Sequence, residues 1–191
     1  FFCKMKVNYS NGKEFSRQTG DKIIMKQYLQ HIRAIMVLPF SVTILIPSIL
    51  WFFVTAPKTD WKRWPLLIAI PLGMIGLGLL VWTIMLLGRH GKGTLAPWDP
   101  TQKLVVCGPY AYVRNPMISG VLMILLAEAI AGQSGAIALW FGLFAGINAV
   151  YFILSEEPGL RKRFGSEYEE YCRNVPRFFP RWTPWRRPGD D

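Results

Sequence analysis

The sequence is poor in charged residues, in cysteine and in histidine. Only 18% of its 191 residues are charged, whereas an ordinary soluble domain has about 25%, so a freely soluble protein is disfavoured. The cysteines, Cys3, Cys107 and Cys172, are odd in number and contain no CxxC pair, and His31 and His90 lie far apart. These counts argue against a disulfide framework and a zinc site, and we expect no metal.

The composition also argues against disorder and against nucleic-acid binding. Hydrophobic residues make up 51% of the chain and aromatic residues 14%, far more than a disordered chain contains. A net charge of +10 would suit nucleic acid, but long apolar runs separate the basic residues. Lipid is therefore the expected solvent, and the predicted fold class is an all-α integral membrane protein.

Four segments are apolar enough to enter a bilayer, namely residues 35–54, 66–87, 117–131 and 135–154. A helix needs about 20 residues to cross the hydrocarbon core, so the third segment, which also carries Glu128, is short. We predict about four to five transmembrane helices. The third and fourth segments form a short hairpin with Gln133 and Ser134 in its turn, because a connection this short can only join antiparallel neighbours.

Small residues predict where these helices pack closely. Gly142 and Gly146 are four residues apart in the fourth segment, and Gly73 and Gly76 lie in the second. Small residues at this spacing allow a neighbouring backbone to approach. We expect packing, and nothing more, from these glycines.

The lysines and arginines predict the orientation. Of the 22, 19 fall in the N-terminal region, the 88–116 loop and the C-terminal tail, which share one side of a four-span bundle. By the positive-inside rule that side is cytoplasmic, so both termini are expected there, in the cytoplasmic membrane if the protein is prokaryotic. The first apolar segment is too long and begins too late for a signal peptide. We divide the chain into three parts. Residues 1–30 are a polar segment to which we assign no function, residues 31–88 contain the first two spans, and residues 89–191 form the third part.

The middle loop is unusually specific for a membrane anchor. Residues 91–116 combine seven glycines and prolines with the β-prone run 104–106. This composition predicts an ordered cytoplasmic loop that is not helical. Polar backbone so close to the membrane must be satisfied by protein or by a ligand. Its Gly-Lys-Gly-Thr sequence fails the spacing of a nucleotide-binding P-loop.

An acidic pair, Glu156 and Glu157, follows the fourth segment. Carboxylates at a helix C-terminus oppose the helix dipole, and Pro158 disfavours helical geometry at Glu157. We therefore expect the chain to break here and a new helix to begin at Pro158. Three interpretations stay open, namely a ligand role for the carboxylates, a solvated acidic pair, or an ion pair with Arg161 and Lys162.

The residues after the acidic pair predict an amphipathic helix. Leu160, Phe164, Tyr168 and Tyr171 share one helical face, which should cover the middle loop on the cytoplasmic side. The tail, 175–187, is extended, aromatic and basic, a composition that fits the headgroup region.

Taken together, these motifs resemble the isoprenylcysteine carboxyl methyltransferase family and the related phospholipid methyltransferases. The motifs, in chain order, are LVVxGPYxYVRNP at 104–116, EExxL at 156–160, and FGxxYxxYxxxVP with a further proline at 164–180. The resemblance covers about half the chain, and its strength lies in the order and spacing of the pieces around the hairpin. It implies that region 89–191 is catalytic.

The resemblance implies an enzyme that uses S-adenosylmethionine to methylate a lipid-like acceptor such as a prenylcysteine carboxylate, with membrane lipids and this acceptor as partners. The implied cofactor-binding residues are Gln102, Lys103, Leu104, Val105, Tyr110, Asn115, Pro116, Met117, Ile118 and Glu156. Arg114 and Glu157 are assigned to positioning at the catalytic centre. Three kinds of side chain would suit this cofactor. Its ammonium group needs an acid, Glu156 or Glu157, and its carboxylate could be bound by Arg114. Its sulfonium could be stabilised by Tyr110 together with Tyr112 or Trp98.

Two departures from the family leave the acceptor open. Asn115 stands where the family often has histidine, and Phe152 stands where eukaryotic prenylcysteine enzymes have an arginine near the substrate carboxylate. One alternative is a phospholipid N-methyltransferase, for which Glu157 would be the nearest base. Further alternatives are an NADPH-dependent membrane reductase, which has a similar tail, and a non-catalytic membrane adaptor that binds anionic lipid.

Overall fold

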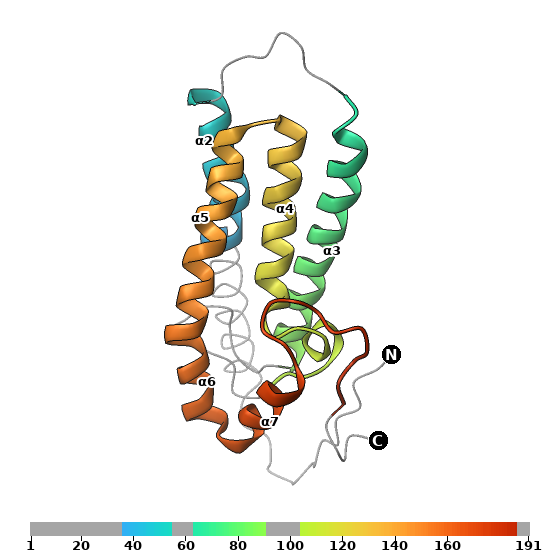
Figure 1. Cartoon of the computed structure of the whole chain (residues 1–191), viewed down its shortest axis with the longest axis vertical. Helices are drawn as coiled ribbons and strands as arrows, with labels where there is room; N and C mark the ends of the chain where they lie inside the picture. Colours follow the sequence, from blue (N-terminus) through green and yellow to red (C-terminus); the bar gives the residue numbers. More distant parts are fainter. Residues whose placement is uncertain (1–35, 55–62, 91–103, 187–191) are drawn as a thin grey trace, which may run out of the picture.

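The computed structural model shown in Figure 1 describes residues 36–54, 63–90 and 104–186. These residues form helices, without a strand in the described ranges, which confirms the all-α prediction. The elements are η1 (Met36–Leu45), α2 (Ile46–Phe53), α3 (Leu66–His90), η2 (Gly108–Ala111), α4 (Pro116–Gly132), α5 (Gly135–Tyr151), η3 (Phe152–Glu156), α6 (Glu157–Phe164) and α7 (Ser166–Asn174).

Helices α2, α3, α4 and α5 stand upright side by side, and η2, α6 and α7 gather at one end, which we call the site end (Figure 1). Within a few residues, the four predicted apolar segments correspond to η1 with α2, to α3, to α4, and to α5 with the start of η3. Leu66–Leu87 and the continuous helix Gly135–Phe164 are long and apolar enough to cross a membrane. Many large apolar side chains of α3 and α5 point outward, as expected where the surroundings are apolar rather than aqueous.

Helix α4 is the short third segment. Its 17 residues span about 26 Å at 1.5 Å per residue, and it gains length by including Pro116 and Gly132. The predicted turn is confirmed, since Gln133 adopts a left-handed φ of 48° and the Ser134 hydroxyl accepts a hydrogen bond from the Ile137 N–H. This turn lays α5 antiparallel to α4.

Helices α3 and α4 pack closely at two glycines. A Cβ on Gly76 would lie 2.9 Å from the Gly120 carbonyl oxygen, and a Cβ on Gly120 would lie 2.9 Å from the Gly76 carbonyl oxygen. The predicted close approach at Gly76 is confirmed. The same expectation for Gly142 and Gly146 is wrong for the part of the chain that the structure describes, because nothing there lies within 4 Å of a Cβ at either position.

The predicted break at Pro158 is also wrong. Glu157 has helical dihedrals (φ −61°, ψ −45°), and the chain passes from α5 into α6 through the π-helical turn η3. A proline ring crowds the carbonyl four residues earlier in an α-helix, and the wider π turn accommodates it. The break comes instead at Gly165, whose φ of 54° and ψ of −129° suit glycine. The single amphipathic helix that we expected is therefore divided into α6 and α7.

Gly76→Ala tests the α3–α4 contact. The added methyl group has no room beside the Gly120 carbonyl, so we expect the free energy of unfolding to fall by about 1–3 kcal/mol. The matched control is Gly78→Ala on the same helix, where a Cβ meets nothing within 4 Å. Thermal unfolding in detergent, followed by circular dichroism, should separate the two variants, and equal melting temperatures would contradict the proposed packing.

Candidate functional site

The site end is built on the 3-10 turn η2, which precedes α4. Gly108 has a φ of +61°, and a Cβ there would lie 3.3 Å from Leu86 and 3.5 Å from Trp82 of α3. Glycine is thus required both for the backbone conformation and for the close approach. This contact fixes η2, and with it Tyr110, against the end of α3.

A cluster rich in aromatic residues packs against residues 104–106 of the middle loop. Its buried members are Tyr168, Tyr171 and Val175. The partly buried residues packed against them are Leu104, Val106, Leu160, Phe164, Cys172 and Trp185. The predicted face of α6 and α7 therefore does cover residues 104–106. The Tyr171 hydroxyl also donates a 2.8 Å hydrogen bond to the Tyr110 carbonyl, which ties α7 to η2.

Arg114 joins the segment before α4 to α6 and α7. Its Nε donates to the Val175 carbonyl at 2.8 Å, its Nη1 to Glu157 Oε1 at 2.6 Å and its Nη2 to the Cys172 carbonyl at 2.8 Å. All three guanidinium nitrogens are thus engaged within the protein. This geometry suits the predicted positioning role better than contact with a cofactor carboxylate.

Glu157 is held by two arginines. Its side chain is 5% exposed, and it also accepts hydrogen bonds from Nε and Nη2 of Arg177, each at 2.8 Å. These hydrogen bonds raise the pKa of Arg177. The partners are therefore Arg114 and Arg177, and not Arg161 and Lys162 as one interpretation of the sequence had it. Sequence reasoning missed Arg177 because it lies 20 residues further on, in a segment without helical periodicity.

The neighbouring carboxylate, Glu156, has the opposite surroundings. It is exposed, its side chain forms no capping hydrogen bond at the start of α6, and it forms no hydrogen bond or ion pair with any residue that the structure describes. Burial and nearby charges, that of the Glu156 carboxylate among them, raise the pKa of the Tyr110 hydroxyl, which therefore stays protonated. The Glu156 carboxylate, which follows the hairpin, is thus within electrostatic range of the Tyr110 phenol, which precedes it.

The structure describes several of the remaining predicted site residues, and the others lie outside the described residues. Leu104 packs against the aromatic cluster and Val105 is buried. The Asn115 side chain caps α4 by accepting a hydrogen bond from the Ile118 N–H at 3.3 Å. Pro116 is the buried first residue of that helix, and Met117 packs against the bundle core. Gln102, Lys103 and Trp98 lie outside the described residues.

A tail segment forms the outer wall of the site end. The Pro176 carbonyl accepts a hydrogen bond from the Arg114 N–H, and the Arg181 and Trp185 N–H groups donate to the Tyr112 and Ala111 carbonyls, at 3.0–3.1 Å. We call residues 176–185 the strap. Its composition predicts an extended, aromatic and basic tail, but the pairing with residues 111–114 has no local signal in the sequence.

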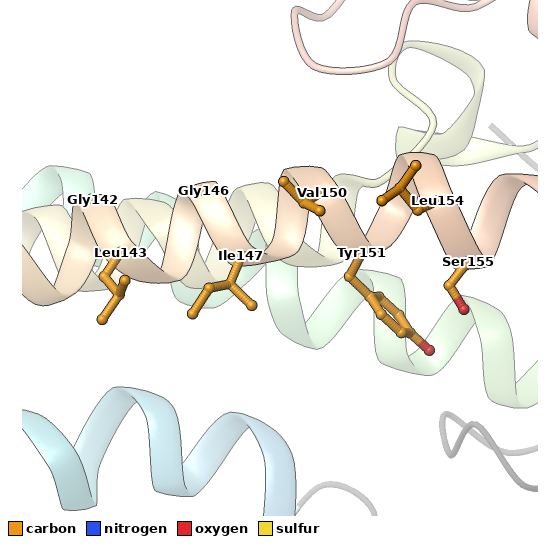
Figure 2. A pocket seen from close by; sticks show the side chains of 8 residues that line it. All are labelled: Gly142, Leu143, Gly146, Ile147, Val150, Tyr151, Leu154 and Ser155. Atoms are coloured by element: carbon orange, nitrogen blue, oxygen red, sulfur yellow. The ribbon is translucent and has the colours of Figure 1, made fainter.

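A shallow and open apolar groove of about 670 Å³ runs along one face of α5 and η3. It is lined by Gly142, Leu143, Gly146, Ile147, Val150, Tyr151, Leu154 and Ser155. In Figure 2 the side chains of Leu143, Ile147, Tyr151 and Ser155 point to the same side of the helix. Ser155 immediately precedes Glu156, so the groove leads toward the exposed carboxylate. Among the described residues, no group of three or more His, Cys, Asp or Glu side chains could hold a metal ion.

The chain is similar to known proteins. A family model described as phospholipid methyltransferase matches residues 64–167. The cobalt-zinc-cadmium resistance protein CzcN of Cupriavidus metallidurans is 28% identical over 125 residues, which are 65% of this chain and 57% of CzcN. The chain thus spans less than two thirds of that relative's length. No solved structure matches the chain.

Alanine variants of the two arginines should differ in stability. Arg114 is 12% exposed at its side chain, and its loss leaves buried acceptors unpaired, so we expect Arg114→Ala to lower the free energy of unfolding by about 3 kcal/mol. Arg177 is 35% exposed, and we expect Arg177→Ala to cost about 1 kcal/mol. Chemical unfolding in detergent measures both losses. Equal losses would show that Arg114 does not hold the site end together.

Proposed function

The chain belongs to the phospholipid methyltransferase family, as its motifs indicated, and from this premise we propose that it transfers a methyl group from S-adenosylmethionine to a lipid-like acceptor at the site end. The family is one of membrane methyltransferases. One observation carries the proposal. Of two adjacent carboxylates, Glu157 accepts hydrogen bonds from two arginines, whereas Glu156 stays exposed, within electrostatic range of Tyr110.

The residues around Glu156 fit the chemistry of S-adenosylmethionine, which supplies an activated methyl group on a positively charged sulfur. We assign the cofactor's ammonium group to the Glu156 carboxylate, because a charged acceptor is the strongest partner for it. The Tyr110 ring can stabilise the sulfonium. The apolar run at Leu104 and Val105 is proposed to contact the adenosine moiety, together with the preceding Gln102 and Lys103.

On the α4 side, we propose that the first turn completes the pocket. Asn115, Pro116, Met117 and Ile118 stand at the junction of the loop and the helix, where the Asn115 cap and the buried proline fix the backbone. Arg114 and Glu157 then act as positioning residues. Their ion pair holds this junction against α6, the helix that follows Glu156.

The surroundings of Glu157 favour an acceptor that is already ionised. An amine must lose a proton before it can attack, but both Glu157 oxygens accept hydrogen bonds from arginines, which makes this carboxylate a weak base. A carboxylate acceptor needs no base, only alignment and the exclusion of water. We therefore propose a prenylcysteine-like carboxylate as the acceptor. For the alternative, a phospholipid amine, Glu156 would have to serve both the cofactor and the proton.

The groove along α5 suits the hydrocarbon chain of such an acceptor. From Gly142 to Ser155 it follows the helix for about 20 Å, and its lining is apolar apart from its last residues. A chain lying in this groove would present its polar end near Glu156. The basic residues of the site end favour the cytoplasmic leaflet for this reaction.

Glu156→Ala tests the cofactor site. Loss of a charged hydrogen-bond partner costs about 2 kcal/mol, so we expect the affinity for S-adenosylmethionine to fall about 30-fold in isothermal titration calorimetry. Glu169→Ala, which removes an exposed carboxylate from α7, is the matched control and should bind normally. Unchanged affinity of the Glu156 variant would overturn the assignment. A wild-type protein that binds no cofactor would favour the adaptor, and NADPH binding would favour the reductase.

Gly146→Leu tests the groove. A leucine there fills space that would hold two or more methylene groups of the acceptor, each worth about 0.8 kcal/mol. With radiolabelled S-adenosylmethionine and a prenylcysteine acceptor, we expect KM for the acceptor to rise about tenfold while cofactor affinity is unchanged. Gly78→Leu adds the same side chain in open space on α3 and should leave KM unaltered. Equal KM values for the two variants would remove the groove from the proposal, and methylation of phosphatidylethanolamine instead would replace the acceptor.

A further inference from the structure

The strap has an outer face that the site does not use. Three of its aromatic side chains, Phe178, Phe179 and Trp182, are 47%, 84% and 99% exposed. The strap itself is fixed by its backbone hydrogen bonds to residues 111–114 and by the ion pair of Arg177 with Glu157. Large aromatic side chains held outward on a fixed segment indicate an interaction surface.

The position of the strap indicates what covers this face. Arg114, whose N–H donates to the Pro176 carbonyl, lies two residues before the start of the apolar helix α4 at Pro116. In Figure 1 the strap lies at the end of the bundle where α4 begins and α3 ends. If α4 enters the bilayer, the strap stands at the boundary between hydrocarbon and water.

The charges near the strap favour a lipid surface. Arg181 lies within the strap and Arg186, which is exposed, directly follows it. Aromatic rings together with arginines are favourable among lipid headgroups, and basic residues are attracted to anionic lipids. A soluble protein would have to reach the same face at the bilayer surface, which makes it the less favoured partner.

We propose that each of the two faces of the strap has a function. The inner face closes the site end, and the outer face inserts Phe178, Phe179 and Trp182 among the headgroups of the adjacent leaflet. The bilayer is the partner of the outer face. Because Arg177, next to the first of these aromatics, is paired with Glu157, lipid contact also stabilises the wall of the site. This inference requires α4 to lie in the bilayer, but it does not require methyl transfer.

Photo-crosslinking tests the proposal on the full-length chain. The photoreactive residue p-benzoylphenylalanine replaces Trp182 or Phe179 in separate variants, in vesicles of phosphatidylcholine with phosphatidylglycerol, and phospholipid adducts are measured by mass spectrometry. The matched negative control carries the same residue in place of Glu169, which is exposed on α7, and the positive control carries it in place of Ile147, which is exposed on α5. We expect adduct yields at 179 and 182 several-fold above the yield at 169.

Yields at 179 and 182 equal to that at 169, with lipid adducts at 147, would overturn the proposal. Adducts at 182 to a protein in native membranes, without lipid adducts, would also overturn it and identify a protein partner. A second measurement uses the fluorescence that Trp182→Phe removes. Brominated lipid should quench this component and aqueous iodide should not, and the reverse result would contradict insertion. Neither readout depends on cofactor binding, so a failure here and a failure of the methyltransferase proposal are distinguishable.

Discussion

The ion pair between Arg114 and Glu157 is the interaction on which the site end depends. It joins a residue that precedes the hairpin to one that follows it, and the same guanidinium holds the carbonyls of Cys172 and Val175 at the end of α7. A buried ion pair gains little net stability unless its remaining groups are satisfied. Here the carboxylate accepts three hydrogen bonds and the guanidinium donates three. The pair therefore determines how the segment before α4, helix α6, the end of α7 and the strap are arranged.

The burial of Glu157 also explains the exposure of Glu156. Successive residues of a helix point about 100° apart, so a helix that turns Glu157 toward Arg114 must turn Glu156 away from it. The two carboxylates therefore cannot have the same surroundings. The different surroundings of the two carboxylates follow from helix geometry and from the position of Arg114. Glu156 is therefore the carboxylate that is available to a cation near Tyr110.

The parts of this structure that could be predicted from the sequence are those that local patterns determine. Apolar length predicted the upright helices, two turn residues predicted the hairpin, and the spacing of Leu160, Phe164, Tyr168 and Tyr171 predicted the buried face of α6 and α7. The pairing of the strap with residues 111–114 and the contact of Arg177 with Glu157 depend on residues far apart in the chain. Contacts of this kind leave no periodic pattern in the local sequence. The basic, aromatic composition of the tail predicted only the character of the strap's outer face.

The π turn η3 shows why local rules were wrong at Pro158 and how the error bears on the site. A proline inside a helix normally marks a break, but one extra residue in the turn before it relieves the crowding and also rotates everything that follows by about 100°. An uninterrupted α-helix in place of Phe152–Glu156 would present a different residue to Arg114. The π turn therefore sets which of the two carboxylates is buried, and with it which one faces the end of the groove at Ser155. The irregular turn that the sequence rules did not predict is thus the element that orients the candidate site, in keeping with the frequent occurrence of π turns at functional positions.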